Sequence, residues 1–265
     1  MNLLTRRALV GALAGAALLV TAMPHAAAQT VDELKKKGSI NIGLLVDFPP
    51  YGTVDASNNP DGYDADVARL LGKDWGIKVN LVPVTGPNRI PFLLTNKVDL
   101  LVASLAVTPE RAKQVQFSRP YSAATIVLYA PKKLGIKSAA DLKGLRVAVA
   151  RASTQDTALT AIAPAGTEIR RFDDDASAMQ ALLSGQVDAI GCSTTVAAQI
   201  AKRAGDGYEN KFILKQQFMA VAMRQNQPEL LKAVNEFVAR NIANGELNTL
   251  YRKWLQTDLP ALPAD

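Results

Sequence analysis

The stretch LLVASLAVTPER, residues 100–111, contains both elements from which we predict the fold. Its first four residues are apolar and predict a short buried strand. Thr108, Pro109 and Glu110 then have the residue types of a helix start: a capping threonine, a proline at the first helical position and an acid in the first turn. A strand followed within a few residues by a helix is the building unit of α/β proteins.

The alternation of apolar runs and helical patterns continues on both sides of this stretch. We expect strands at residues 40–46, 79–84, 146–150, 168–172, 187–191 and 218–223, and helices near residues 63–71, 90–94, 178–183, 195–204, 228–244 and 246–255. This order predicts an α/β fold with largely parallel sheets, organised as two units that join near residues 129–132. Small ligands bind such folds in a cleft beyond the carboxyl ends of the strands.

The N-terminus, residues 1–28, is predicted to be an export signal that is cleaved after Ala28. Arg6 and Arg7 precede an uncharged run of 15 residues, which is shorter than the about 20 residues of a membrane-spanning helix. The alternative is an N-terminal membrane anchor. The paired arginines are compatible with general or with twin-arginine export. We expect a protein of the bacterial periplasm.

Composition excludes several classes of function. The chain has 265 residues, 48% of them hydrophobic and 20% charged, which is typical of a globular protein. Its single cysteine, Cys192, excludes a disulfide framework and is expected to be buried. Its single histidine, His25, lies in the export signal, so the mature chain lacks the residue for His-based catalysis. The net charge of +6, without a long basic run, argues against nucleic-acid binding, and we expect no cofactor and no metal.

The residues after the strand in the opening stretch are suited to bind an anion. Ser104 offers a hydroxyl, the helix start at Thr108 offers free backbone amides, and Arg111 can hold a carboxylate with two hydrogen bonds. The alternative is that Arg111 pairs with Glu110 or Asp99 on the surface. The residue types alone favour neither interpretation.

Three further features have more than one interpretation. Ser153 and Thr154 follow a predicted strand, and they either meet the same anion from the second unit or only cap a helix. Phe48 follows another strand beside two prolines, and it either stacks on a ligand or packs in the core. The three aspartates at 173–175 are expected to cap a helix and face solvent rather than to hold a metal.

Short motifs follow one another along the mature chain. They are Gly62-Tyr-Asp-Ala-Asp-Val67, Lys97-Val-Asp99, Thr108-Pro-Glu-Arg111, Phe117-Ser-Arg-Pro-Tyr121, Asp141-Leu-Lys-Gly144 with Ser153-Thr154, Gly185-Gln-Val-Asp-Ala189, and a tail with Asn235, Gly245 and Trp254. In this order they make nearly the whole mature chain resemble the periplasmic solute-binding proteins of family 3, the polar amino-acid receptors of ABC importers.

The resemblance implies a two-lobed periplasmic binding protein fold of type II, in which two Rossmann-like lobes are joined by two hinge strands. Lobe 1 would comprise residues 29–128 and 219–265, and lobe 2 residues 129–218. The implied function is to bind an amino acid or a related small carboxylate between closing lobes. The protein would then dock, as a monomer, on an ABC permease of the inner membrane. A sensory receptor that presents its ligand to a membrane sensor would have the same sequence features.

The resemblance also implies roles for particular residues. Arg111 matches the arginine that binds the ligand's α-carboxylate. The other matched ligand-binding positions are Ser104, Ala106, Thr154, the covering aromatic Phe48, and Asn88 in the loop that reads the ligand side chain. Arg89, in the same loop, either reads an acidic group or faces solvent.

One departure from the family pattern concerns the ligand's ammonium group. Ser193 is counted as a ligand-binding position, but it stands where the family usually places the aspartate that binds this ammonium. A buried ammonium without a carboxylate costs on the order of several kcal/mol. Either Asp47 or Asp156 substitutes for that aspartate, or the ligand carries no α-ammonium. A second departure is Leu45, at a position that tends to be acidic in receptors for basic amino acids, so lysine, arginine and histidine are less suitable ligands.

The scaffold also resembles cyclohexadienyl dehydratases, which act on prephenate or arogenate and need a carboxylic acid in the cleft as proton donor. The positions that the resemblance places in the cleft are Ser104, Ala106, Thr154 and Ser193, and none of them is an acid. We therefore expect a binding protein rather than an enzyme.

Overall fold

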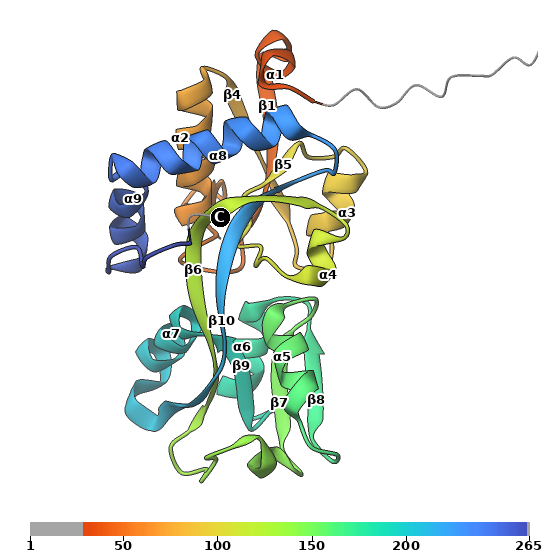
Figure 1. Cartoon of the computed structure of the whole chain (residues 1–265). Helices are drawn as coiled ribbons and strands as arrows, with labels where there is room; N and C mark the ends of the chain where they lie inside the picture. Colours follow the sequence, from red (N-terminus) through yellow and green to blue (C-terminus); the bar gives the residue numbers. More distant parts are fainter. Residues whose placement is uncertain (1–28, 264–265) are drawn as a thin grey trace, which may run out of the picture.

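The computed structural model describes residues 29–263, which form two lobes joined by two long strands (Figure 1). The export signal predicted at residues 1–28 lies outside the described residues. We call the half with the N-terminal and C-terminal helices lobe 1, and the half formed by the middle of the chain lobe 2. Within residues 29–263, no helix is both long and apolar enough to cross a membrane.

An eight-stranded sheet runs through both lobes, in the order β4-β1-β5-β10-β6-β9-β7-β8. In lobe 1, β1 (Ser39–Leu45) pairs in parallel with β4 (Lys78–Val84) and with β5 (Leu100–Leu101). The register places Ile42 of β1 opposite Leu100 of β5, and both side chains are fully buried.

In lobe 2, β7 (Arg146–Ala150) pairs in parallel with β8 (Glu168–Phe172) on one side and β9 (Ala189–Ser193) on the other. Each lobe is thus a small parallel sheet with crossover helices, in which the carboxyl ends of the strands point to one edge. The predicted α/β fold with largely parallel sheets is confirmed.

The two strands that cross between the lobes are β6 (Gln116–Pro131) and β10 (Tyr208–Met223), which pair with each other in antiparallel orientation. Their pairing begins at Gln116 and Met223 in lobe 1 and ends at Pro131 and Tyr208 in lobe 2. The lobe boundaries predicted after residues 128 and 218 fall inside these two strands. Two paired crossings favour bending and twisting at the strands as the relative motion of the lobes.

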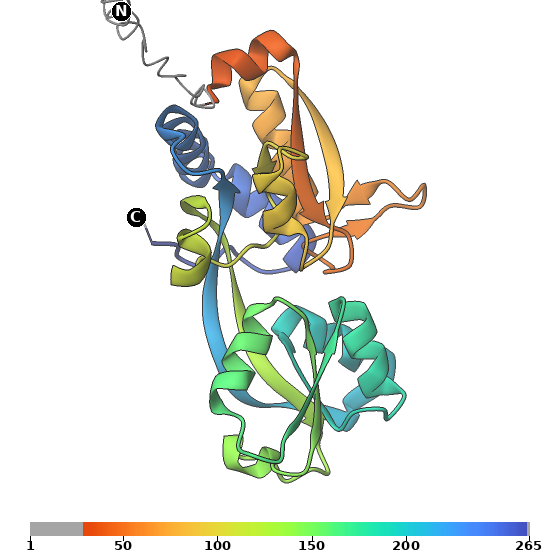
Figure 2. The same cartoon turned by 90° about the vertical axis from the view of Figure 1, so that its right-hand side faces the viewer.

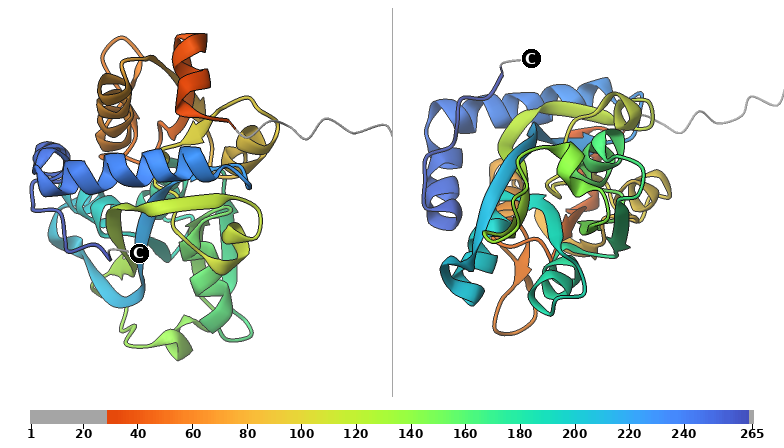
Figure 3. Two further views of the ribbon diagram at one scale, coloured as in Figure 1. Left: turned by 45° about the horizontal axis from the view of Figure 1, so that its top comes forward. Right: turned by 90° about the horizontal axis from the view of Figure 1, so that it is seen from below.

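Helices pack on the sheet in both lobes (Figures 1 and 3). Lobe 1 contains α1 (Val31–Lys37), α2 (Tyr63–Trp75), α3 (Arg89–Leu94), α4 (Pro109–Ala112), α8 (Pro228–Ala243) and α9 (Glu246–Leu255), with a hairpin of β2 (Thr53–Val54) and β3 (Pro60–Asp61). Lobe 2 contains α5 (Thr154–Ile162), α6 (Asp175–Leu183) and α7 (Thr194–Ala204), with 3-10 turns at Ala139–Leu142 and Gly205–Gly207. The long α8 packs on β6, and α9 packs on both α2 and α8.

Three strand predictions are wrong in extent. The strand expected at residues 100–103 is only Leu100–Leu101. The strand expected at 187–191 lies at Ala189–Ser193, because Asp188 stands before the strand and its carboxylate accepts a hydrogen bond of 2.9 Å from the Arg146 amide. The strand expected at 218–223 is only the end of β10, which has 16 residues. The first half of β10 carries several exposed polar side chains, so it lacks the apolar run that predicts a strand.

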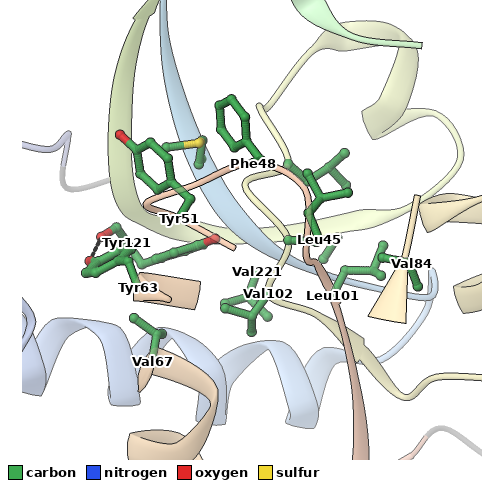
Figure 4. Close-up of a cluster of buried hydrophobic side chains, with 14 of the residues drawn as sticks. Leu45, Phe48, Tyr51, Tyr63, Val67, Val84, Leu101, Val102, Tyr121 and Val221 are labelled. Atoms are coloured by element: carbon green, nitrogen blue, oxygen red, sulfur yellow. Dashed lines mark hydrogen bonds between the residues drawn. The ribbon is translucent and has the colours of Figure 1, made fainter. Parts of the chain in front are cut away.

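Aromatic side chains of the lobe 1 core pack against the loop that follows β1 (Figure 4). Tyr63 and Tyr121 are fully buried and stack with ring centroids 5.9 Å apart. Tyr51 packs edge-on against Tyr63, and Phe48 stacks on Tyr51 at 5.3 Å. Because Phe48 is itself only 5% exposed, the loop after β1 is anchored in the core rather than free in solvent.

Candidate functional site

A cleft lies between the two lobes and is bordered by segments at the ends of the strands. Figure 2 shows how the two lobes face each other. Lobe 1 contributes the loop after β1 and the segment between β5 and α4, and lobe 2 contributes the starts of α5 and α6. Parallel strands direct their carboxyl ends to such a cleft. The lining residues are Leu45, Asp47, Phe48, Gly86, Arg89, Ser104, Ala106 and Arg111 of lobe 1, Ala150, Arg151, Ser153, Thr154, Gln155, Asp173, Asp174 and Asp175 of lobe 2, and Gln217 of β10.

Arg111 bridges the two lobes at one side of the cleft. Its Nη1 donates to the carbonyl of Ala106 at 2.9 Å, and its Nη2 donates across the cleft to the carbonyl of Ala152 at 3.0 Å. Among the described residues, its guanidinium group forms no ion pair, so the surface pairing with Glu110 or Asp99 is not found. Burial and the charge of Arg89 lower the pKa of Arg111 to about 9. Glu110 interacts with this arginine without forming an ion pair, so no ion-paired anion among the described residues balances its charge.

Ser104 is held in a left-handed conformation by a buried carboxyl group. Its φ is 47°, its amide donates to the hydroxyl of Tyr121 at 3.2 Å, and its own hydroxyl donates to Asp64 Oδ2 at 2.7 Å. The Tyr121 hydroxyl donates in turn to Asp64 Oδ1 at 2.7 Å. The Ser104 hydroxyl proton is thus directed into lobe 1, and the backbone of residues 104–106 borders the cleft.

Lobe 2 presents the start of α5 to the same cleft, and here the two hydroxyl residues have different roles. Ser153 is the helix cap, because its Oγ accepts a hydrogen bond from the Asp156 amide at 3.2 Å. Thr154 is buried, lines the cleft and shares a hydrogen bond with Gln217 of β10. The capping interpretation therefore holds for Ser153, although both Ser153 and Thr154 line the cleft.

Arg89 is a buried arginine of the cleft wall, with 6% of its surface exposed. Its Nη1 donates to the Ala103 carbonyl at 3.0 Å and its Nε to the Gly86 carbonyl at 3.3 Å. These bonds join the loop before α3 to the loop after β5. Its neighbour Asn88 does not line the cleft, because its Oδ1 accepts a hydrogen bond from the Thr85 amide inside its own turn.

Ser193 does not line the cleft either. It is fully buried and caps α7, with its Oγ accepting from the Val196 amide at 3.2 Å and bonded to the Thr195 hydroxyl at 2.7 Å. Asp156 is no substitute for the acid that the family places at Ser193, because it pairs with Arg171 at 3.0 Å and does not line the cleft.

The acids of the cleft are Asp47 and the aspartates that begin α6. Asp174 caps the helix, as expected, by accepting from the Ser177 amide at 2.6 Å, and Asp173 is 82% exposed beside Arg151. The expectation that the run faces solvent is wrong for Asp175, which is half-buried and accepts from Gln155 Nε2 at 3.0 Å.

Two of the cleft carboxyls, those of Asp47 and Asp175, have raised pKa values. Burial, reinforced by the charge of Asp174, raises the pKa of Asp47 to about 6. Burial, reinforced by the charge of Asp47, raises the pKa of Asp175 to about 7. Sequence reasoning had one signal for Asp175: it opens a helix just after a parallel strand, as Thr154 does in the neighbouring unit. Within residues 29–263, no group of three His, Cys, Asp or Glu side chains is arranged to hold a metal ion.

The sequence from residue 40 to residue 257 matches the model of one protein family, the bacterial extracellular solute-binding proteins, family 3. The chain belongs to this family. The resemblance inferred from the motifs is confirmed by this match, which spans both lobes and the two crossing strands.

Relatives of the chain are named as amino-acid-binding proteins. The L-cystine-binding protein TcyJ of Escherichia coli is 28% identical over 97% of either chain. The ABC transporter glutamine-binding protein GlnH of Bacillus subtilis is 29% identical over 86% of this chain and 85% of its own length. A solved structure, the ancestral amino acid-binding protein AncCDT-1, a precursor of cyclohexadienyl dehydratase, is 35% identical with a TM-score of 0.79 and covers 85% of this chain and 99% of its own.

Proposed function

We propose that this chain is the periplasmic substrate-binding component of an ABC importer, and that it binds an amino acid or a related small carboxylate between its lobes. The observation that carries the proposal is the guanidinium group of Arg111. Its two hydrogen bonds end on carbonyls of different lobes, Ala106 and Ala152, and neither bond neutralises its charge. A ligand carboxylate supplies the anion that this half-buried cation lacks.

Five of the seven residues that the resemblance marked as ligand-binding line the cleft. In the proposal, Arg111 binds the carboxylate, the backbone at Ser104 and Ala106 contributes polar contacts, Thr154 contributes a hydroxyl from lobe 2, and Phe48 covers the ligand. The other two, Asn88 and Ser193, serve turn and helix capping instead.

Function then rests on binding energy rather than on chemistry. Lobe 1, residues 29–128 and 219–265, and lobe 2, residues 129–218, move relative to each other about β6 and β10. A ligand that contacts both lobes stabilises the closed arrangement, and the closed form docks on an ABC permease. Export directed by residues 1–28 delivers the chain to the periplasm, where it acts as a monomer.

The test is a calorimetric titration of the refolded, ligand-stripped mature protein, after a thermal-shift screen of L-amino acids and organic acids. A ligand present at 100 times its Kd adds about 2.7 kcal/mol of stability, which is visible as a raised Tm. Arg111→Ala is expected to weaken binding of the best compound by about 2–5 kcal/mol. The matched control is Arg203→Ala, which changes an exposed arginine on α7 and should leave Kd unchanged. Wild-type affinity in Arg111→Ala would refute the assignment.

A second candidate, a dehydratase on the same scaffold, gains support from one observation. None of the four cleft positions given by the resemblance is an acid, but Asp47 and Asp175 also line the cleft, and their raised pKa values suit a proton donor. We still favour the binding protein, because both curated relatives compared above are named as binding proteins. Incubation with prephenate should therefore form no phenylpyruvate, and phenylpyruvate formation by the wild type that Asp175→Asn abolishes would establish the enzyme.

A further inference from the structure

Two carboxylates from opposite lobes line the cleft, and Arg89, the cation that interacts with both, forms no ion pair with either among the described residues. Asp47 follows β1 in lobe 1, and Asp175 is the first residue of α6 in lobe 2. Among the described residues, neither forms an ion pair, and the hydrogen bond that Asp175 accepts comes from the neutral amide of Gln155. We propose that the ammonium group of the bound amino acid lies between Asp47 and Asp175 and so joins the two lobes. This inference rests on the proposed function of the cleft.

The arrangement of charge supports a zwitterionic ligand over a simple anion. The cleft contains Arg111, whose charge is not neutralised, and also this carboxylate pair. A carboxylic acid without an amine satisfies the arginine but leaves the like charges of the two interacting aspartates in the cleft. An amino acid satisfies both, because its carboxylate and its ammonium lie on one carbon and each meets the opposite charge.

The charged groups around each aspartate favour a cation between the two. Asp47 is affected by Asp174 and Arg89, and Asp175 by Asp47, Asp174 and Arg89. The thiol of Cys192 also interacts with Asp175, and its pKa is raised by burial. Arg89 is the only one of these groups with a positive charge, and its Nη1 and Nε are bonded to carbonyls. One cation therefore offsets less than the charge of the surrounding acids.

The position differs from the one that the family pattern suggests. Ser193 carries no charge and is fully buried, and its Oγ accepts the hydrogen bond that caps α7. It therefore cannot bind the ammonium group. An acid at that position would lie entirely in lobe 2. The Asp47–Asp175 pair instead divides the ammonium site between the lobes, so that closure itself assembles the site. Without a bridging cation, closure brings two like charges together.

The experiment compares amines with their acylated counterparts on three asparagine variants. The probes are L-cystine, L-cysteine, L-glutamine and L-arginine, each beside its N-acetyl derivative, titrated into the ligand-stripped mature protein at pH 8. The variants are Asp47→Asn, Asp175→Asn and Asp173→Asn. The last is the matched control, because Asp173 lies in the same run but is 82% exposed. An asparagine keeps the shape and removes the charge.

We expect at least one free amino acid to bind the wild type and its N-acetyl derivative not to bind. Asp47→Asn and Asp175→Asn should each weaken that binding by about 30-fold or more, whereas Asp173→Asn should stay within about twofold. The two weakened variants should have an unliganded Tm equal to or above that of the wild type at pH 8, because a like-charge contact is removed. A merely structural role would lower that Tm.

Three outcomes separate failure of the inference from failure of the proposed function. Equal binding of an amino acid and its N-acetyl derivative, with loss in Arg111→Ala, overturns the inference alone. Wild-type affinity in both Asp47→Asn and Asp175→Asn also overturns the inference alone. If neither these probes nor the amino acids and organic acids of the thermal-shift screen bind the wild type, the proposed function falls, and the inference falls with it.

Discussion

The hydroxyl of Ser104 lies 2.7 Å from Oδ2 of Asp64, a carboxyl group with no exposed surface at the start of α2. Through this contact the core of lobe 1 sets the conformation of a loop that borders the cleft. Tyr121 completes the arrangement, because its hydroxyl accepts a hydrogen bond from the Ser104 amide and donates one to the Asp64 carboxyl group. The buried polar group thus has its partners, as buried groups require.

Asp64→Ala should destabilise the protein by about 2–4 kcal/mol, because it leaves the hydroxyls of Ser104 and Tyr121 buried without their acceptor. Urea unfolding measures the loss. Asp61→Ala, which removes an exposed ion pair with Arg69, is the control and should cost less than about 1 kcal/mol. Equal losses in the two variants would contradict a structural role of the Asp64 network.

The stability of the unliganded protein should fall as pH rises from about 5 to 8. The pKa values of Asp47, Asp64 and Asp175 are raised, by burial first, to about 6, 7 and 7, so in this range the folded state binds more protons than the unfolded state. Their favourable contribution is complete at low pH and is lost as pH passes the folded pKa values. Urea midpoints across the range test this. Asp175→Asn should flatten the profile, and a profile that rises with pH would refute the assignment.

Gly62→Ala should be far more damaging than Gly38→Ala. Both glycines have a positive φ, of 115° at Gly62 and 76° at Gly38. A Cβ added to Gly62 would lie 2.5 Å from the Tyr51 carbonyl oxygen, whereas a Cβ added to Gly38 would have no atom within 4 Å. We expect a loss of about 1 kcal/mol for Gly38→Ala and of about 3 kcal/mol or more for Gly62→Ala. Thermal unfolding of the pair checks the difference, and similar Tm values would contradict the close approach.

Gln199→Ala should weaken ligand binding without destabilising either lobe. Gln199 Nε2, on α7 of lobe 2, donates to the Pro49 carbonyl of lobe 1 at 2.6 Å. Loss of one such bond costs about 0.5–1.5 kcal/mol, and it should appear as faster ligand dissociation. Stopped-flow kinetics with the best ligand of the thermal-shift screen provides the measurement. Lys202→Ala, an exposed change on the same helix, serves as control, and an unchanged dissociation rate in Gln199→Ala would argue against the contact.

Local sequence patterns predicted the elements that local interactions determine. The strands at Arg146–Ala150 and Glu168–Phe172 and the helix at Glu246–Leu255 have the predicted bounds, because apolar runs and helix signals mark both of their ends. The crossing strands were harder to predict. Much of β10 has exposed polar side chains, and its strand conformation depends on pairing with β6, about a hundred residues away in sequence.

The candidate site also contains residues that local sequence marks and residues that only contacts between distant parts of the chain bring to the cleft. Arg111 and Thr154 line the cleft. The residue types at the strand–helix junctions had left a surface ion pair and a helix cap as alternatives, and only the resemblance made these residues ligand-binding positions. Asp175 was missed, because its pKa depends on burial in the fold and on the charges of Asp47 and Arg89, which belong to the other lobe and to much earlier sequence. Ser193 was placed in the cleft by resemblance alone, and nothing in the local sequence distinguishes a ligand contact from the helix cap that it forms.

The pairing of Pro131 with Tyr208 at the far end of the crossing strands has a consequence for engineering. The chain enters lobe 2 and leaves it at adjacent points, so this lobe is a continuous insertion in a lobe 1 whose sequence is split. The inserted segment can be transplanted between relatives as one cassette with two neighbouring junctions. Half of the cleft, including Thr154 and Asp175, travels with it. Chimaeras of this kind would separate the specificity carried by each lobe without redesigning either core.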